Sequence, residues 1–177
     1  MKGPAGFDVR NRLCRLYGAG DVPLHWTPLS TIALAVVNML RNPEPVLNRA
    51  IHIYGVENLT QLTILSSLET ILGEKFTVEN VDIEKIDRNS KIILERGNGV
   101  RAMNGLSIAA QFSEEARREK ERKEGFDNEV VGVKALSVEE AIQEAFGRWG
   151  VDCPVVEGMF RVEAPEVYED VRDPGQA

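Results

Sequence analysis

Apolar residues recur at helical spacing in several stretches of the chain and alternate with polar residues in others. In residues 29–40 they occupy one helical face, which predicts an amphipathic helix with these residues inward: Leu29, Ile32, Ala33, Val36, Val37 and Leu40. Thr27 is placed to cap this helix with its hydroxyl group, and Pro28 suits the first helical position. The two prolines at Pro43 and Pro45 end the helix.

Two further helices carry start and stop signals. Thr60 is a capping residue before a helix that ends at Gly73, a residue that tolerates the left-handed cap conformation. Ser137 and Glu140 form a capping box at the start of a helix over residues 138–149. The inward faces are expected to be Ile64, Leu65, Leu68, Ile71 and Leu72 in the first helix, and Val138, Ala141, Ile142, Ala145, Phe146 and Trp149 in the second.

Three segments have the pattern of strands. Residues 12–17 alternate loosely and lead into the turn Gly18-Ala19-Gly20-Asp21, and residues 76–83 alternate again. Residues 48–54 are short and rich in Ile and Tyr, which predicts a buried strand. Strands interleaved with helices predict the α/β fold class.

Residues 84–112 are predicted to be helical but interrupted, because Gly97, Gly99 and Gly105 each cost a helix interior about 1 kcal/mol relative to alanine. A substrate lid could lie there. The run Gly97-Asn98-Gly99-Val100-Arg101-Ala102 formally fits a dinucleotide fingerprint, but the segment after it is a charged helix rather than the strand of a βαβ unit. A break between two helices is the preferred interpretation.

Residues 114–124 hold five acids and five bases, with Glu114–Arg118 and Glu119–Lys123 at favourable helical spacing. A solvated helix face is expected, with docking of a partner protein as the alternative.

Composition narrows the function classes. The chain has 177 residues, enough for about one domain, with 43% hydrophobic and 28% charged residues. The net charge of -7 disfavours nucleic acid or an anionic membrane as a partner. No apolar run is long enough to span a membrane, and the N-terminal sequence lacks the apolar core of a signal peptide, so a cytoplasmic location is expected. Cys14 and Cys153 fit no metal or redox spacing and are expected to be reduced thiols.

Candidate ligand-binding residues are few. His25 and Trp26 precede the first helix at a strand end, where open α/β sheets bind ligands, although core packing of Trp26 and a turn position for His25 are the favoured interpretations. Met103, Phe112 and Phe126 flank the glycine-interrupted region and could form an apolar substrate wall or pack in the core. No catalytic, cofactor-binding or metal-ligating residue is predicted.

Short motifs in order along residues 6–149 resemble the middle and C-terminal part of the fungal NmrA-like and isoflavone-reductase-like family of atypical short-chain dehydrogenases. The matching motifs are Gly6-Phe7-Asp8, Asn11-Arg12, Tyr17-Gly18-Ala19-Gly20-Asp21, the stretch from Thr27 to Ala33, Asn48-Arg49, Ile51-His52-Ile53, Thr60-Gln61, the stretch from Gly73 to Val78, Asp127-Asn128-Glu129 and Val138-Glu139-Glu140. Each motif alone is a helix cap or strand end, and their order carries the resemblance.

The resemblance implies a fold and an activity. The chain would be the C-terminal, substrate-side portion of a Rossmann-like NAD(P)-binding fold, with the N-terminal dinucleotide-binding half and the family's catalytic Lys region absent. Residues 1–26 would be a remnant strand and turn at the junction, residues 27–150 the α/β portion, and residues 151–177 an extended or partly disordered tail. Full-length members use NADP, and the complete protein would reduce a small aromatic or polyketide-like molecule of secondary metabolism.

Alone, the chain is expected to bind no cofactor tightly and to be inactive. The alternatives are a non-catalytic binding or regulatory module, or a truncated relic. Because residues 48–54 would normally extend a parallel sheet, self-association through an exposed sheet edge is expected.

Overall fold

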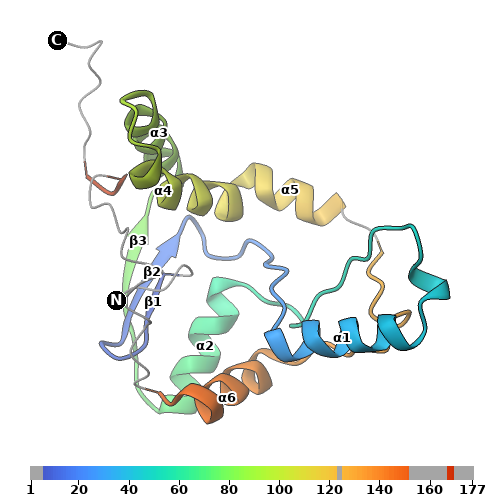
Figure 1. Cartoon of the computed structure of the whole chain (residues 1–177). Coiled ribbons are helices and arrows are strands. Elements are labelled where there is room, and N and C mark those ends of the chain that lie inside the picture. The colour runs from blue at the N-terminus through green and yellow to red at the C-terminus, as the bar shows by residue number, and fades with distance from the viewer. Residues whose placement is uncertain (1–5, 123–124, 152–166, 170–177) are drawn as a thin grey trace.

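The protein has a mixed α/β fold in which a small three-stranded sheet packs against helices (Figure 1). The computed structural model describes residues 6–122, 125–151 and 167–169. Strand β2 (Leu13–Tyr17) is central, with β1 (Phe7–Asp8) antiparallel on one side and β3 (Thr77–Val81) parallel on the other. The strands predicted near residues 12–17 and 76–83 are therefore confirmed.

The helices divide into two pairs and two single elements. Helix α3 packs along α4 and α2 packs along α6; in Figure 1 the first pair lies at the upper end of the strands and the second beside their lower part. Helices α1 and α5 extend away from this body. The bounds are α1 Leu29–Arg41, the 3-10 helix η1 Glu44–Val46, α2 Gln61–Leu72, α3 Ile83–Glu95, α4 Gly99–Phe112, α5 Glu114–Arg122 and α6 Val138–Trp149.

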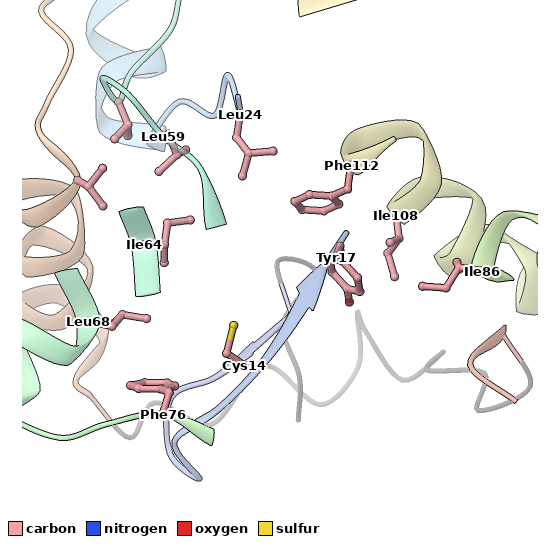
Figure 2. Packing of buried hydrophobic residues seen from close by; sticks show 12 residues of the cluster. Cys14, Tyr17, Leu24, Leu59, Ile64, Leu68, Phe76, Ile86, Ile108 and Phe112 are labelled. Carbon is pink, nitrogen blue, oxygen red and sulfur yellow. The ribbon is translucent and has the colours of Figure 1, made fainter. Parts of the chain in front are cut away.

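One hydrophobic core joins the sheet to both helix pairs (Figure 2). Cys14 and Tyr17 of β2 contribute to it, and Phe76 closes it at the start of β3. The helices add Ile64 and Leu68 from α2, Ile86 from α3, Ile108 and Phe112 from α4, and Val138 from α6. Because these residues come from elements far apart in sequence, their burial fixes the arrangement of the whole body.

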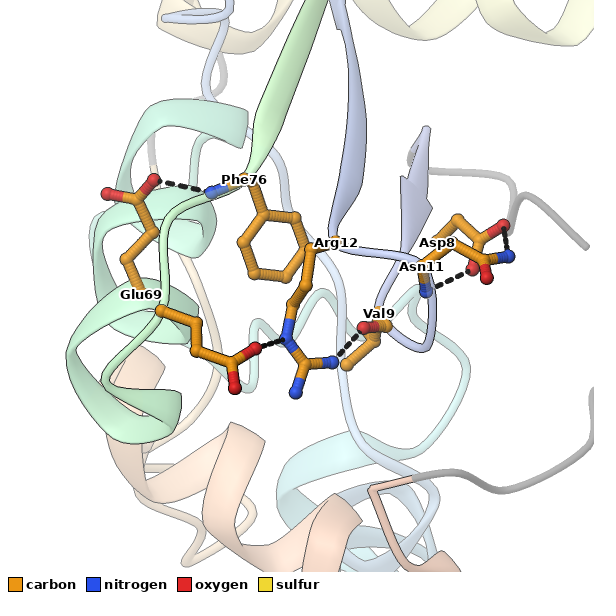
Figure 3. A network of polar contacts seen from close by, with 7 residues as sticks. Asp8, Val9, Asn11, Arg12, Glu69 and Phe76 are labelled. Atoms are coloured by element: carbon orange, nitrogen blue, oxygen red, sulfur yellow. Dashed lines mark hydrogen bonds and ion pairs between the residues drawn. The ribbon is translucent and has the colours of Figure 1, made fainter.

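A set of polar contacts holds the β1–β2 hairpin against the start of β3 (Figure 3). Asp8 accepts hydrogen bonds from the backbone and side chain of Asn11 at 3.1 and 2.9 Å. Arg12, which has a positive φ of 54°, donates to the Glu74 carboxylate at 2.6 Å and to the Val9 carbonyl oxygen. These contacts fix a hairpin that is too short to be stable on its strand pairing alone.

Two of the helices begin at the capping residues that the sequence predicts. Thr60 caps α2, Gly73 ends it with φ 67°, and Ser137 with Glu140 forms the capping box of α6, as predicted. Asp82 caps α3, which was not predicted. The prediction for α1 was wrong in detail: Pro28 stands at the N-cap and Thr27 provides no cap.

The inward face predicted for α1 is also wrong. The exposed fractions of Leu29 and Leu40 are 73% and 77%, and Ile32, Val36 and Val37 are exposed as well. The helix buries Thr31 and Ala35 instead, and Ala35 packs with Val131 and Val133. Asn38 and Met39 face the protein on the same side, where α1 rests on the loops of residues 42–54 and 127–133 rather than on the core (Figure 1).

Gly97 and Gly105 have different roles in the arrangement of α3 and α4. The predicted break lies at residues 96–98, where Gly97 has φ 78°. Gly105 was expected to interrupt the helix, but α4 runs through it. A Cβ at Gly105 would lie 2.0 Å from Ser90 Oγ, so the residue is required for the close approach of α3 and α4.

Residues 48–54 form no strand, which corrects the prediction for this segment and for His52 within it. The side chains of Asp127 and Asn128 bind its backbone, as described below, and no described strand lies beside it. The described residues therefore form no sheet edge at this segment; the outer strands of the described sheet are β1 and β3, and the residues of β3 are mostly exposed.

Near the C-terminus, residues 167–169 form a tight turn beside α3. Val167 is fully buried with Ile93 and Ala102, and Asn89 donates a hydrogen bond to the Val167 carbonyl oxygen at 3.2 Å. The extended tail predicted from residue 151 otherwise lies outside the described residues, as does Cys153. None of the helices described is both long and apolar enough to cross a membrane.

Candidate functional site

An apolar cavity of about 440 Å³ opens between the N-terminal end of α1 and the helices α2 and α6. Its volume lies in the range of small-molecule sites, roughly 300–1,000 Å³. The lining residues are Trp26, Thr27, Pro28, Leu29, Val56, Leu59, Ile64, Val138, Ala141, Ile142, Glu144, Ala145, Arg148 and Trp149. Most of these side chains are hydrophobic, so the cavity favours an apolar ligand.

Two adjacent stretches of backbone that run antiparallel, residues 24–28 and 55–59, build the inner wall. The Leu24 N–H donates to the Leu59 carbonyl oxygen at 2.7 Å, and the Gly55 N–H donates to the Trp26 carbonyl oxygen at 3.2 Å. A Cβ at Gly55 would lie 2.4 Å from Pro28 Cδ, so only glycine lets the two runs approach this closely. Trp26 and Pro28 are thereby held at the cavity.

The same inner wall positions α6. The Glu57 N–H donates to the Leu136 carbonyl oxygen, and the Leu136 N–H donates to that of Gly55, both at 2.9 Å. Ser67 of α2 donates to the Glu139 carboxylate of α6 at 2.5 Å, and this bond lowers the pKa of Glu139. Helix α6 therefore starts from a fixed position and presents Ala141, Ala145 and Trp149 to the cavity.

Polar groups lie at the outer part of the lining. Ser30 of α1 donates to Glu144 Oε1 of α6 at 2.7 Å, which joins the two helices across the cavity. Arg148 lies one helical turn after Glu144, with its guanidinium carbon 5.4 Å from the ring centroid of Trp149. A ligand inside would meet an apolar wall and one acid and one base at its edge.

Of the five candidate ligand-binding residues predicted from the sequence, Trp26 alone lines the cavity. His25 and Phe126 lie together in a neighbouring aromatic cluster with Tyr54: the Phe126 ring is 5.2 Å from that of His25 and 4.7 Å from that of Tyr54, both edge to face. These three side chains are half-buried. The cluster covers the loop beside α1 rather than opening into the cavity.

Met103 and Phe112 do not join either group. Met103 is 63% exposed on α4, and Phe112 is buried in the core with its ring 4.9 Å from that of Tyr17. The five predicted residues therefore do not converge on one site, because helical spacing alone does not show which face of α4 meets the core.

Asp127 and Asn128 have the structural role expected of a turn. The Asp127 carboxylate accepts from the His52 N–H at 2.9 Å and from Arg49 at 2.8 Å, and these bonds lower its pKa. The Asn128 side chain accepts from the Tyr54 N–H at 3.1 Å and donates to the Tyr54 carbonyl oxygen at 2.8 Å. The two side chains therefore bind backbone groups of residues 52–54 that would pair with a neighbouring strand in a sheet.

Cys14 is unsuited to nucleophilic chemistry in the folded protein. Its side chain is buried in the core, and burial, with a smaller contribution from the charge of Glu69, raises the pKa of the thiol to about 11. A neutral, buried thiol is a poor nucleophile.

The cavity walls formed by α2 and α6 were missed as a site because their apolar residues fit the pattern of an ordinary core face. The structure reveals the difference through exposure: Trp149 is 60% exposed, and Ala145 is exposed although it lies on the apolar stripe. No sequence signal distinguishes a stripe that meets the core from one that lines a cavity.

Among the described residues, no group of three or more His, Cys, Asp or Glu side chains is placed to hold a metal ion. Comparisons of the chain with protein-family models, with curated proteins and with solved structures found no match.

Proposed function

We propose that this chain is the substrate-side portion of an NADPH-dependent reductase of the NmrA-like type, and that the cavity between α1, α2 and α6 receives the small molecule. The cavity is the observation that carries the proposal. It has the size and apolar lining that bind an aromatic or polyketide-like body. The order of the family-like motifs supports the type of reductase.

The hydride would come from NADPH held by a separate nucleotide-binding half. The exposed apolar face of α1 and the strand-like residues 48–54, which lack a neighbouring strand among the described residues, are surfaces on which such a half would pack. This chain alone would then bind NADPH weakly, because its break at Gly97 and Gly99 lies between two helices rather than after a strand.

A second candidate is a non-catalytic binding module. The described lining contains no histidine, lysine, tyrosine or cysteine, and its one carboxylate, Glu144, already accepts the Ser30 hydroxyl, so the cavity walls offer few groups for proton transfer or nucleophilic attack. The two candidates share the ligand site and differ in whether a nucleotide-binding half adds the chemistry.

The ligand site is tested with 4-phenyl-2-butanone, a neutral aromatic ketone. Both tryptophans of the chain, Trp26 and Trp149, line the cavity, so their fluorescence reports on its occupancy. We expect saturable quenching in the unchanged protein and its loss in Ala145→Phe, which fills the cavity. Ala33→Phe is the matched control, because Ala33 is exposed on α1 outside the lining.

Absence of saturable quenching, or equal binding by Ala145→Phe, would contradict the site. A low-micromolar affinity for NADPH in the same titration would contradict the assignment of nucleotide binding to a separate half.

A further inference from the structure

Two opposite charges stand on one face of α6 beside the cavity. Glu144 and Arg148 are four residues apart and both line it. This order is favourable for an ion pair within a helix. The structure holds them in different contacts instead.

Glu144 is engaged across the cavity. Its Oε1 accepts the Ser30 hydroxyl at 2.7 Å, which directs the carboxylate toward α1. An acceptor already bonded to a hydroxyl group on a neighbouring helix is less available to a ligand.

Arg148 is available. In the described part of the chain its side chain meets the face of Trp149, with 5.4 Å between the guanidinium carbon and the ring centroid, and no carboxylate. A guanidinium presents a planar set of donors that matches a carboxylate in a two-point contact, and stacking on an aromatic ring orients that plane.

The helix end alone would disfavour an anion. Arg148 lies in the last turn of α6, where the helix dipole is equivalent to about half a negative charge. The full positive charge of the guanidinium outweighs it, so an anion at this position depends on Arg148.

We infer that the cavity takes a small molecule with an aromatic or otherwise apolar body and a single carboxylate, the body lying against Trp26 and Ile142 and the carboxylate at Arg148. The inference rests on the proposed function, since it requires that the cavity bind a small molecule. It adds the charge of that molecule and the residue that recognises it.

The test compares 4-phenylbutanoate with 4-phenylbutanamide, which has nearly the same shape and no charge. Tryptophan fluorescence of the full chain gives both affinities. We expect the acid to bind about three- to fivefold more tightly than the amide, the range for an exposed ion pair. Arg148→Gln should remove that preference by weakening acid binding more than amide binding, and added salt should weaken only the acid.

Two further variants test whether the effect is specific to the charge at Arg148. Arg41→Gln is the matched control, because Arg41 also lies in the last turn of an exposed helix but outside the cavity; it should keep the preference. Glu144→Gln should strengthen acid binding by removing a nearby negative charge.

The outcomes separate this inference from the proposed function. Equal binding of acid and amide, or a preference that survives Arg148→Gln, would overturn the carboxylate site and leave the apolar site standing. If 4-phenyl-2-butanone, the acid and the amide all fail to bind, the proposed site fails and the inference fails with it.

Discussion

Gln61 is a polar residue that is fully buried, and its amide group explains why. Its Oε1 accepts the Tyr17 N–H at 2.9 Å and its Nε2 donates to the Arg15 carbonyl oxygen at 2.9 Å. These are backbone groups of β2 beyond the end of the short β1. The side chain therefore completes the edge of the central strand, a role that the sequence could not reveal because the partners lie more than forty residues away.

Gln61→Leu should lower the free energy of unfolding by about 2 kcal/mol, because it removes the two hydrogen bonds that the Gln61 amide makes with the backbone of β2. Urea denaturation measures the change. Gln143→Leu on the exposed face of α6 is the matched control and should have little effect. Equal stability of the two variants would show that Gln61 is not needed to satisfy β2.

The Cys14 thiol should resist labelling by a disulfide reagent at about pH 8 in the folded protein and react once urea is added, since only the thiolate reacts. Its pKa is raised from 9.0 to about 11, so the folded state favours the neutral thiol. The stabilisation is fully present below pH 9 and is lost as the pH rises toward 11. A Cys153→Ser background isolates Cys14, and rapid labelling without urea would contradict its burial.

At the scale of elements, local signals were sufficient for the caps of α2 and α6 and insufficient for the cap of α1 and for packing. The caps of α2 and α6 were predicted because capping residues act on backbone within three or four positions. The strand expected at residues 48–54 did not form, because a strand needs a neighbour and the structure supplies side chains instead. Trp26 was the one candidate residue placed at the cavity, although it follows a stretch without regular structure rather than the strand end that was expected.

Asn128→Asp should destabilise the loop at residues 52–54. The aspartate keeps the acceptor for the Tyr54 N–H but loses the donor to the Tyr54 carbonyl oxygen and places negative charge beside it. We expect a loss of about 1 kcal/mol in unfolding free energy and faster amide exchange at Tyr54. Asn80→Asp, on the exposed strand β3, is the control. Unchanged exchange at Tyr54 would refute the bridging role of Asn128.

At the scale of the whole molecule, an isolated chain exposes the apolar face of α1 to solvent. Contiguous apolar surface promotes association. We expect concentration-dependent self-association in sedimentation velocity, and Leu40→Lys should reduce it without loss of stability because Leu40 is 77% exposed. Leu94→Lys, at an exposed apolar position on α3, is the control. A wild-type chain that stays monomeric at all concentrations would contradict this prediction.

The most direct test of the proposed site is an amide chemical-shift titration of the full chain with 4-phenyl-2-butanone. The account predicts saturable shifts that gather at the cavity, around Leu29, Leu59 and Ile142, and the same titration with NADPH should produce none at micromolar concentrations. Shifts spread along the exposed face of α1 with none at Leu59 or Ile142, or saturable shifts with micromolar NADPH, would contradict it.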